Sequence, residues 1–213
     1  MPYAVKEVYL SIQGEGAQVG RAAVFCRFAG CNLWSGREDD RATAKCSFCD
    51  TDFVGTDGPG GGRFAAASEL ADHIANASTR SSSETGTRLV IFTGGEPLLQ
   101  LDGALTKEMH AHGFEVAVET NGTLLPPEGV DWICCSPKAG SQLVLRSGHE
   151  LKLVFPQVGL APAELETLDF GHFFLQPMDG PNLVEHTRLA IEYCLRHPRW
   201  RLSLQLHKQL KLR

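Results

Sequence analysis

The stretch Leu89-Val-Ile-Phe-Thr-Gly-Gly-Glu-Pro97 decides the fold, because it joins a buried strand to a polar turn. Its first four residues are apolar and are bounded by polar ones, which predicts a short strand inside a sheet. Residues 98–112 then predict a helix that stops at Gly113. A strand, a polar turn and a helix in this order are typical of α/β folds.

The same alternation continues on both sides of this stretch. It implies right-handed crossovers and a mainly parallel sheet. The strands are too few for a closed eight-stranded barrel, so we expect an α/β fold built as an open, partial β/α barrel. Residues 1–213 are expected to form one domain with an insertion at about 32–45. The predicted strands are 5–12, 22–28, 89–92, 114–119, 132–135, 150–155, 173–175 and 200–205. The predicted helices are 65–77, 98–112, 161–168 and 183–197. Residues 57–62 are predicted to be a flexible loop and residues 78–87 a Ser/Thr-rich loop.

Composition limits the kind of protein. Hydrophobic residues make up 43% of the chain and charged residues 21%, as in soluble globular proteins. The formal net charge of −5 argues against a broad nucleic-acid-binding face. The first residues lack the apolar core of a signal peptide, and no stretch approaches the ~20 apolar residues of a membrane span. We therefore expect a soluble, cytoplasmic protein without nucleic-acid or membrane partners.

Seven cysteines indicate metal or redox chemistry before disulfides, because thiols stay reduced in the cytoplasm. Cys46 and Cys49 can bind one centre from a tight turn, and Cys31 precedes them. Three thiolates on a [4Fe–4S] cubane leave the fourth iron open for another ligand. From spacing alone a structural zinc site and a thioredoxin-like CxxC pair stay open, although no fourth Cys or His lies at a usual zinc spacing.

The turn after residues 89–92 offers a ligand site. Gly94 and Gly95 allow a ligand to approach the backbone closely. Glu96 supplies a carboxylate for an ammonium group. An ordinary strand-to-helix turn is the other interpretation. Polar motifs follow the other predicted strands as well, so we expect them to meet at the carboxyl edge of the sheet.

Three cysteines that end in CxxC, an aromatic residue before the last one and a downstream Gly-Gly-Glu-Pro resemble the radical S-adenosylmethionine superfamily. Its usual spacing is CxxxCxxC, whereas residues 32–45 separate Cys31 from Cys46 here. That insertion and seven further motifs closely resemble the family of 7-carboxy-7-deazaguanine synthases over nearly the whole chain. The motifs are Ser11-Ile-Gln-Gly-Glu-Gly16, Phe25-Cys-Arg-Phe-Ala-Gly-Cys31, Cys49-Asp-Thr51, Glu119-Thr-Asn-Gly122, Ser136-Pro-Lys138, Gln176-Pro-Met-Asp179 and Gln205-Leu-His-Lys208.

The resemblance implies that Cys31, Cys46 and Cys49 hold a [4Fe–4S] cluster and that S-adenosylmethionine chelates its open iron. Glu119 is expected to face the cofactor's ribose, and Lys138 to pair with its carboxylate. Without the other motifs, residues 136–138 would be a turn with an exposed lysine. The implied cofactor-binding residues are Phe48, Cys49, Asp50, Gly94, Gly95, Glu96, Glu119, Ser136, Pro137, Lys138, Gln176, Pro177, Met178 and Asp179. The other cysteines, Cys26, Cys134, Cys135 and Cys194, match no ligand position and are expected to be small buried hydrophobic residues.

The implied substrate is 6-carboxy-5,6,7,8-tetrahydropterin. Arg27 suits its carboxylate by bidentate pairing, and Thr51 matches a Mg²⁺ ligand of the family. The implied substrate-binding residues are Ile12, Gln13, Gly14, Glu15, Arg27, Thr93, His207 and Arg213. The chain departs from the common family pattern at Leu206 and at residues 210–213.

The implied activity is that of a carbon–nitrogen lyase of queuosine and 7-deazapurine biosynthesis. A 5′-deoxyadenosyl radical abstracts a hydrogen from the pterin, the ring contracts, and ammonia leaves. The family likeness further implies an electron donor such as flavodoxin and a homodimer. Two alternatives stay open: a glycyl-radical-enzyme activase, which would keep the short cysteine spacing, and a zinc-stabilised binding module without catalysis.

Overall fold

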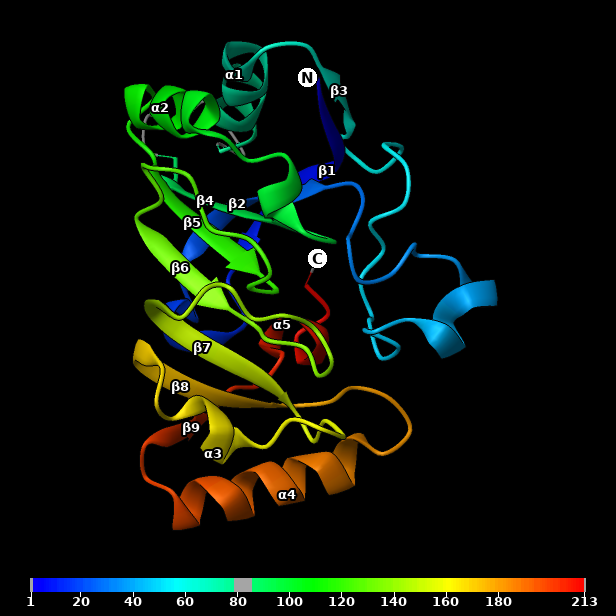
Figure 1. Ribbon diagram of the computed structural model, residues 1–213. Helices are drawn as coiled ribbons and strands as arrows, with labels where there is room; N and C mark the ends of the chain where they lie inside the picture. Colours follow the sequence, from blue (N-terminus) through cyan, green and yellow to red (C-terminus); the bar gives the residue numbers. More distant parts are fainter. Residues whose placement is uncertain (1, 79–85, 213) are drawn as a thin grey trace.

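The computed structural model describes residues 2–78 and 86–212, and these build one mostly parallel, open sheet (Figure 1). The strand order is β3-β1-β2-β4-β5-β6-β7-β8-β9. Neighbouring strands from β2 to β9 are parallel, whereas β1 is antiparallel to β2 and to β3. The strands are β1 Tyr3–Ile12, β2 Ala22–Phe28, β3 Gly62–Phe64, β4 Leu89–Gly94, β5 Glu115–Thr120, β6 Trp132–Cys135, β7 Ser147–Phe155, β8 Asp169–Pro177 and β9 Trp200–Leu202. The predicted α/β class and open, mainly parallel sheet are confirmed.

The helices flank the sheet at its two ends. In Figure 1, α1 and α2 lie beside the strands near β4, while α3 and α4 lie beside β8 and β9. The helices are α1 Ala67–Ala77, α2 Gly103–Ala111, α3 Pro162–Leu165, α4 Leu183–Arg196 and α5 Leu206–Gln209, with 3₁₀ turns η1 Gly16–Gln18, η2 Glu38–Thr43 and η3 Pro97–Leu99. No helix in the described part of the chain is long and apolar enough to cross a membrane.

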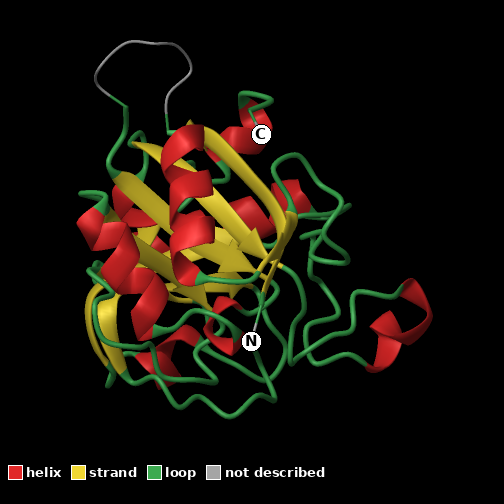
Figure 2. Cartoon of the chain, turned by 90° about the horizontal axis from the view of Figure 1, so that it is seen from above, coloured by secondary structure: helices red, strands yellow, loops and turns green. Residues whose placement is uncertain are grey.

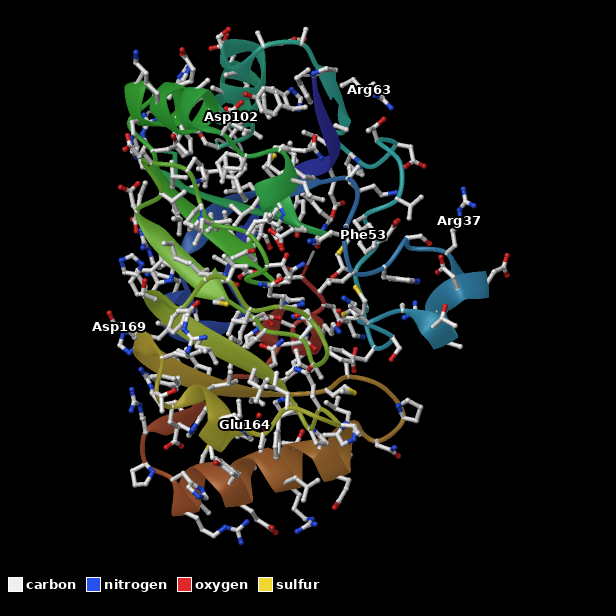
Figure 3. The ribbon with its side chains drawn as sticks, viewed as in Figure 1. Arg37, Phe53, Arg63, Asp102, Glu164 and Asp169 are labelled. Atoms are coloured by element: carbon white, nitrogen blue, oxygen red, sulfur yellow. The ribbon has the colours of Figure 1, made fainter. Side chains whose placement is uncertain are left out.

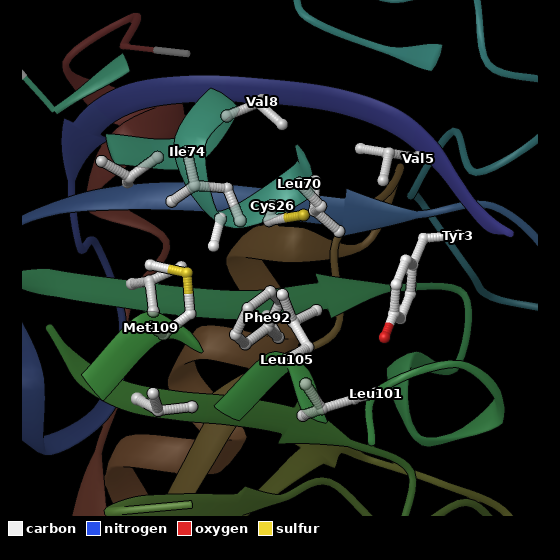
Figure 4. Close-up of a cluster of buried hydrophobic side chains, with 14 of the residues drawn as sticks. Tyr3, Val5, Val8, Cys26, Leu70, Ile74, Phe92, Leu101, Leu105 and Met109 are labelled. Carbon is white, nitrogen blue, oxygen red and sulfur yellow. The ribbon is translucent and has the colours of Figure 1, made fainter. Parts of the chain in front are cut away.

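Strand alternation separates an apolar face from a polar one. On β2, Val24, Cys26 and Phe28 point into the core beneath α1 and α2, which Figure 4 shows in close-up. Arg27, between them, points to the other face, where it lines a cavity. A second core, which includes Cys135, lies around β7, β8 and α4. Burial explains why these cysteines behave as small hydrophobic residues.

The predicted helix 98–112 is in fact two elements. The turn η3 ends at Leu99, and α2 begins only at Gly103. Asp102 causes the restart, because its carboxylate accepts the backbone N–H of Leu105 at 3.0 Å and so caps the new helix. The same carboxylate accepts the hydroxyl of Tyr3 at 2.8 Å and thereby fastens the helix start to β1.

The glycine run at residues 57–62, predicted to be a flexible loop, packs tightly along β1. The Gly58 N–H donates to the Lys6 carbonyl at 2.9 Å. A Cβ atom at Gly61 would lie only 2.2 Å from that same carbonyl oxygen. The glycines therefore allow two backbones to touch, and β3 starts at the last of them, Gly62.

Other differences concern element lengths and one missed helix. The strand predicted at 173–175 extends over Asp169–Pro177, and the helix predicted at 161–168 covers only Pro162–Leu165. The helix α5 was not predicted. The insertion contains η2, which projects away from the sheet (Figure 2). Residues 79–85 of the predicted loop 78–87 lie outside the described residues.

Replacing Gly61 by alanine is expected to destabilise the fold by about 1–3 kcal/mol, because the new Cβ would overlap the Lys6 carbonyl. The matched control is Gly103→Ala, since a Cβ there meets nothing within 4 Å. That change at a helix start should be neutral or slightly stabilising. Urea denaturation measures both free energies of unfolding. Equal values for the two variants would contradict the packing of this loop on β1.

Candidate active site

A cavity of about 380 Å³ opens at the carboxyl ends of the parallel strands. In Figure 1 this is the side of the sheet on which the cysteine loop lies. All residues predicted for the cofactor, substrate and metal line it except three. Glu96 and Pro137 do not reach it, and Arg213 lies outside the described residues. Lining residues without a predicted role are Glu7, Tyr9, Phe25, Leu33, Trp34, Asp52, Phe53, Thr120, Asn121, Cys134, Lys152, Val154, Gln205 and Lys208.

The three predicted ligand cysteines face this cavity together. Cys31 follows β2, and the Cys49 N–H donates to the Cys46 carbonyl at 3.4 Å in the CxxC turn. A hydrogen bond from the Cys46 thiol lowers the pKa of Cys49 to about 6. Burial raises the pKa of Cys31, although the Leu33 N–H, 3.4 Å from the sulfur, favours its thiolate. The hydrogen bond to Cys49 and burial raise the pKa of Cys46. Three cysteine sulfurs that face one cavity suit an iron–sulfur cluster, which binds them as thiolates.

The donor set suits a cluster better than one ion. Among the described residues, no three His, Cys, Asp or Glu side chains are placed to hold a single metal ion. A cubane gives each thiolate its own iron, so its ligands lie further apart than those of one tetrahedral zinc. Three cysteines that face one cavity are the donor set of a cubane whose fourth iron stays open.

The insertion supports the cysteine loop. The Arg41 guanidinium in η2 donates to the carbonyls of Ser47 and Cys49, both at 2.9 Å. It also lies 4.0 Å over the ring of Trp34, which packs edge-on against Phe53. Figure 3 shows Phe53 toward the body of the molecule and Arg37 on the projecting insertion. Residues 32–45 thus brace the loop that carries two of the cysteines.

Glycines bring the end of β4 against the cysteine that follows β2. A Cβ at Gly95 would lie 2.3 Å from the Gly30 carbonyl and 2.7 Å from Cys31 Cβ. Gly94 has a φ of +141° and would meet the Phe28 carbonyl at 2.3 Å. Only glycine fits either position, so the Gly-Gly pair sets where Cys31 lies relative to the turn.

Glu96 accepts three hydrogen bonds that the sequence did not indicate. Its carboxylate is fully buried and accepts the Leu98 N–H at 2.9 Å. It also accepts the Thr120 hydroxyl and the Asn121 N–H, both at 2.7 Å. Burial raises its pKa, and these donors oppose that rise. Glu96 joins the ends of β4 and β5, and its predicted role as a cofactor ligand stays a prediction.

A buried lysine that was not among the predicted site residues also lines the cavity. Lys152, on β7, pairs with Glu15 and lies 3.6 Å from Glu119. Gln13 donates to Glu119 at 2.8 Å. The signal that could have found Lys152 is a lysine inside an otherwise apolar strand segment, residues 151–155.

Arg27 is held on the cavity wall by two neighbours. Its Nε donates to Glu7 at 2.9 Å and an Nη to the Tyr9 hydroxyl at 3.1 Å. Lys138 lies nearer the cysteines and donates to the Ser136 carbonyl and hydroxyl at 2.5 and 2.8 Å. In the described residues Lys138 pairs with no carboxylate, so its charge is available to an acidic ligand.

The helix α5 ties three cavity loops together. Lys208 pairs with both Asp50 and Asp179, and the Gln205 amide donates to Glu15 at 3.1 Å. A Cβ at Gly14 would lie 2.7 Å from His207 Nδ1, so a glycine there lets the C-terminal segment approach. The C-terminal segment therefore forms one wall of the cavity.

The ligand role of the cysteines is testable by iron content. After anaerobic reconstitution, Cys49→Ala should lose most of its iron, because a cubane with two protein thiolates is poorly held. Cys194→Ala is the matched control, since that thiol is half-buried against the second core, away from the cavity. It should keep about four iron atoms per chain, like the unaltered protein. Equal iron in both variants would show that Cys49 is not a ligand.

Comparisons with known proteins show the family to which the chain belongs. The family model described as "Radical SAM superfamily" matches residues 40–149. A 7-carboxy-7-deazaguanine synthase from Bradyrhizobium diazoefficiens is 65% identical over the full length of both chains, and one from Bordetella pertussis is 63% identical over 99% of each. The crystal structure of QueE from Escherichia coli superposes with a TM-score of 0.69 at 26% identity, covering 96% of this chain and 94% of that one. The chain therefore belongs to the 7-carboxy-7-deazaguanine synthase family of the radical S-adenosylmethionine superfamily.

Proposed function

We propose that this enzyme converts 6-carboxy-5,6,7,8-tetrahydropterin into 7-carboxy-7-deazaguanine with loss of ammonia, as a carbon–nitrogen lyase of queuosine biosynthesis. One observation carries the proposal: the three cysteines and the residues predicted for the pterin, apart from Arg213, line the same cavity. Full-length identity to synthases of this name supports it. The same identity sets aside the glycyl-radical-enzyme activase and the zinc-stabilised binding module.

The superfamily implies a [4Fe–4S] cluster and S-adenosylmethionine. When bound, they supply the one-electron chemistry that starts the ring contraction. Cys31, Cys46 and Cys49 would hold the cluster. Lys138 supplies the unpaired cation for the cofactor's carboxylate, and Glu119 can accept two ribose hydroxyls. The other proposed cofactor contacts are Phe48, Asp50, Gly94, Gly95, Glu96, Ser136, Pro137, Gln176, Pro177, Met178 and Asp179.

The substrate half of the cavity is built from β1, β2 and the C-terminal segment. Glu7 and Tyr9 hold the Arg27 guanidinium in place by hydrogen bonds, and this group suits the pterin carboxylate. Glu15 suits the donor edge of the ring. The helix α5, which contains His207, lines this half of the cavity. Ile12, Gln13, Gly14, Thr93 and Arg213 complete the proposed substrate contacts.

Thr51 is the proposed Mg²⁺ ligand. It lines the cavity, as do its sequence neighbours Asp50 and Asp52. A hydroxyl together with substrate oxygens and water suits a cation that keeps much of its hydration. Two further proposals rest on family likeness, a homodimer and an electron donor such as flavodoxin. One domain over residues 1–213 and a cytoplasmic location are proposed from the length and composition of the chain.

The proposed reaction is tested by anaerobic turnover of the reconstituted enzyme with reductant, S-adenosylmethionine, Mg²⁺ and the carboxypterin. Mass spectrometry should detect 7-carboxy-7-deazaguanine and ammonia in equal amounts. Reactions without the cofactor or the reductant are the controls and should give no product. An intact cluster without any deazaguanine would contradict the assigned substrate while leaving the superfamily in place.

Glu119→Ala tests the cofactor half. Loss of hydrogen bonds to a charged acceptor should weaken S-adenosylmethionine binding by about 1.5–3 kcal/mol, roughly ten- to hundredfold in Kd. Iron content and the visible spectrum should stay unchanged, because Glu119 lies on β5 and not on the cysteine loop. Loss of the cluster in this variant would show that Glu119 supports the cluster instead.

A further inference from the structure

The ammonium of Lys152 lies between two carboxylates that come from distant parts of the chain. Glu15 lies in the turn after β1, and Glu119 lies on β5. Lys152 pairs with the first, lies 3.6 Å from the second and has a side chain that is only 5% exposed. In the sheet, β6 lies between β5 and β7 (Figure 1). The Lys152 side chain on β7 therefore reaches past β6 to Glu119 on β5.

Gln13 closes a ring on the other side. Its amide donates to Glu119 at 2.8 Å, and its carbonyl oxygen accepts the Glu15 N–H at 3.2 Å. We call Gln13, Glu15, Glu119 and Lys152 the polar ring. The Glu119 carboxylate thus contacts both Lys152 and the Gln13 amide, whereas the Glu15 carboxylate contacts Lys152 and the Glu15 backbone is held by Gln13. Lys152 is therefore the group that the two carboxylates share.

Lys152 supplies the positive charge of this ring. Within residues 2–78 and 86–212, neither Glu15 nor Glu119 pairs with another lysine or arginine. Burial opposes the charge of Lys152, but Glu119 and Glu15 raise its pKa well above the ordinary value. Lys152 in turn lowers the pKa of Glu15 against the effect of burial. Glu150, also on β7, instead accepts the Ala17 N–H at 2.6 Å.

We propose that Lys152 is a positioning residue that couples the substrate half of the cavity to the cofactor half. This inference rests on the proposed function, in which Glu15 meets the pterin and Glu119 meets the ribose. Lys152 itself is assigned a contact with neither ligand. Its ammonium attracts both carboxylates. A ligand that fixes the position of one carboxylate therefore also fixes the ammonium, and through it the other carboxylate.

Coupling of this kind is reciprocal. If the pterin raises the affinity for S-adenosylmethionine through the polar ring, the cofactor must raise the affinity for the pterin by the same factor. Such a ring favours the complex that holds both ligands. Radical chemistry then starts with the substrate in place, which limits unproductive use of the cofactor.

The decisive experiment changes a residue assigned to the substrate and measures the binding of the cofactor. Glu15→Gln keeps the shape of a residue assigned to the substrate but removes its charge from Lys152. Anaerobic calorimetry of reconstituted enzyme, with no pterin present, should show S-adenosylmethionine binding weakened about fivefold or more. Arg27→Gln is the matched control, because Arg27 is also assigned to the substrate but bonds to Glu7 and Tyr9 outside the ring. Its cofactor Kd should stay within about twofold of the unaltered enzyme.

Lys152 itself gives the second measurement. Lys152→Met should raise both the cofactor Kd and the pterin KM, and the effect of each ligand on the other should fall toward none. Lys152→Arg keeps the charge and should restore most of the coupling. Should Lys152→Met not fold, Glu15→Gln and Arg27→Gln decide the question.

An unchanged cofactor Kd in Glu15→Gln would overturn the proposal, as would Lys152→Met with both ligand affinities unchanged. Cofactor binding is measured here without turnover. A failed pterin assay would therefore refute the proposed reaction without deciding the role of Lys152.

Discussion

The close approach of β4 to the residues after β2 is the constraint on which the site depends. Gly94 and Gly95 have no room for a Cβ against Phe28, Gly30 and Cys31. The Glu96 N–H then donates to the Gly30 carbonyl at 3.0 Å, which locks the two strand ends together. Because the strands are parallel, this contact lies at their carboxyl edge, where the polar motifs of the other strands arrive as well.

The cavity is built largely from polar groups that hold one another. Glu96 is satisfied by three donors, Arg27 by Glu7 and Tyr9, and Lys152 by two carboxylates. Buried ion pairs of this kind add little to stability, because desolvation offsets much of their attraction. Their value is orientation, since a radical reaction requires the reacting atoms to be placed before it begins. Lys138 differs from them, because its charge is left for a ligand.

Much of the fold and most of the lining residues were predictable from the sequence. Strands β2 and β6 lie where the apolar runs predicted them, and all three cysteines meet in one cavity. Lys152 was missed because one sequence does not show which face of a strand meets which partner. Glu96 was taken for a ligand only, because its donors Thr120 and Asn121 are distant in sequence. The separate start of α2 was missed because the prediction used the spacing of apolar residues and not the helix-capping residue Asp102.

In the proposed complex, one cavity holds the cluster beside the pterin. Iron-edge anomalous diffraction from an anaerobic crystal grown with S-adenosylmethionine and the carboxypterin tests it most directly. We expect a compact four-iron peak bounded by Cys31, Cys46 and Cys49, with the pterin carboxylate at Arg27 in the same cavity. A single tetrahedral metal at the cysteines, or a pterin bound elsewhere on the protein, would contradict it.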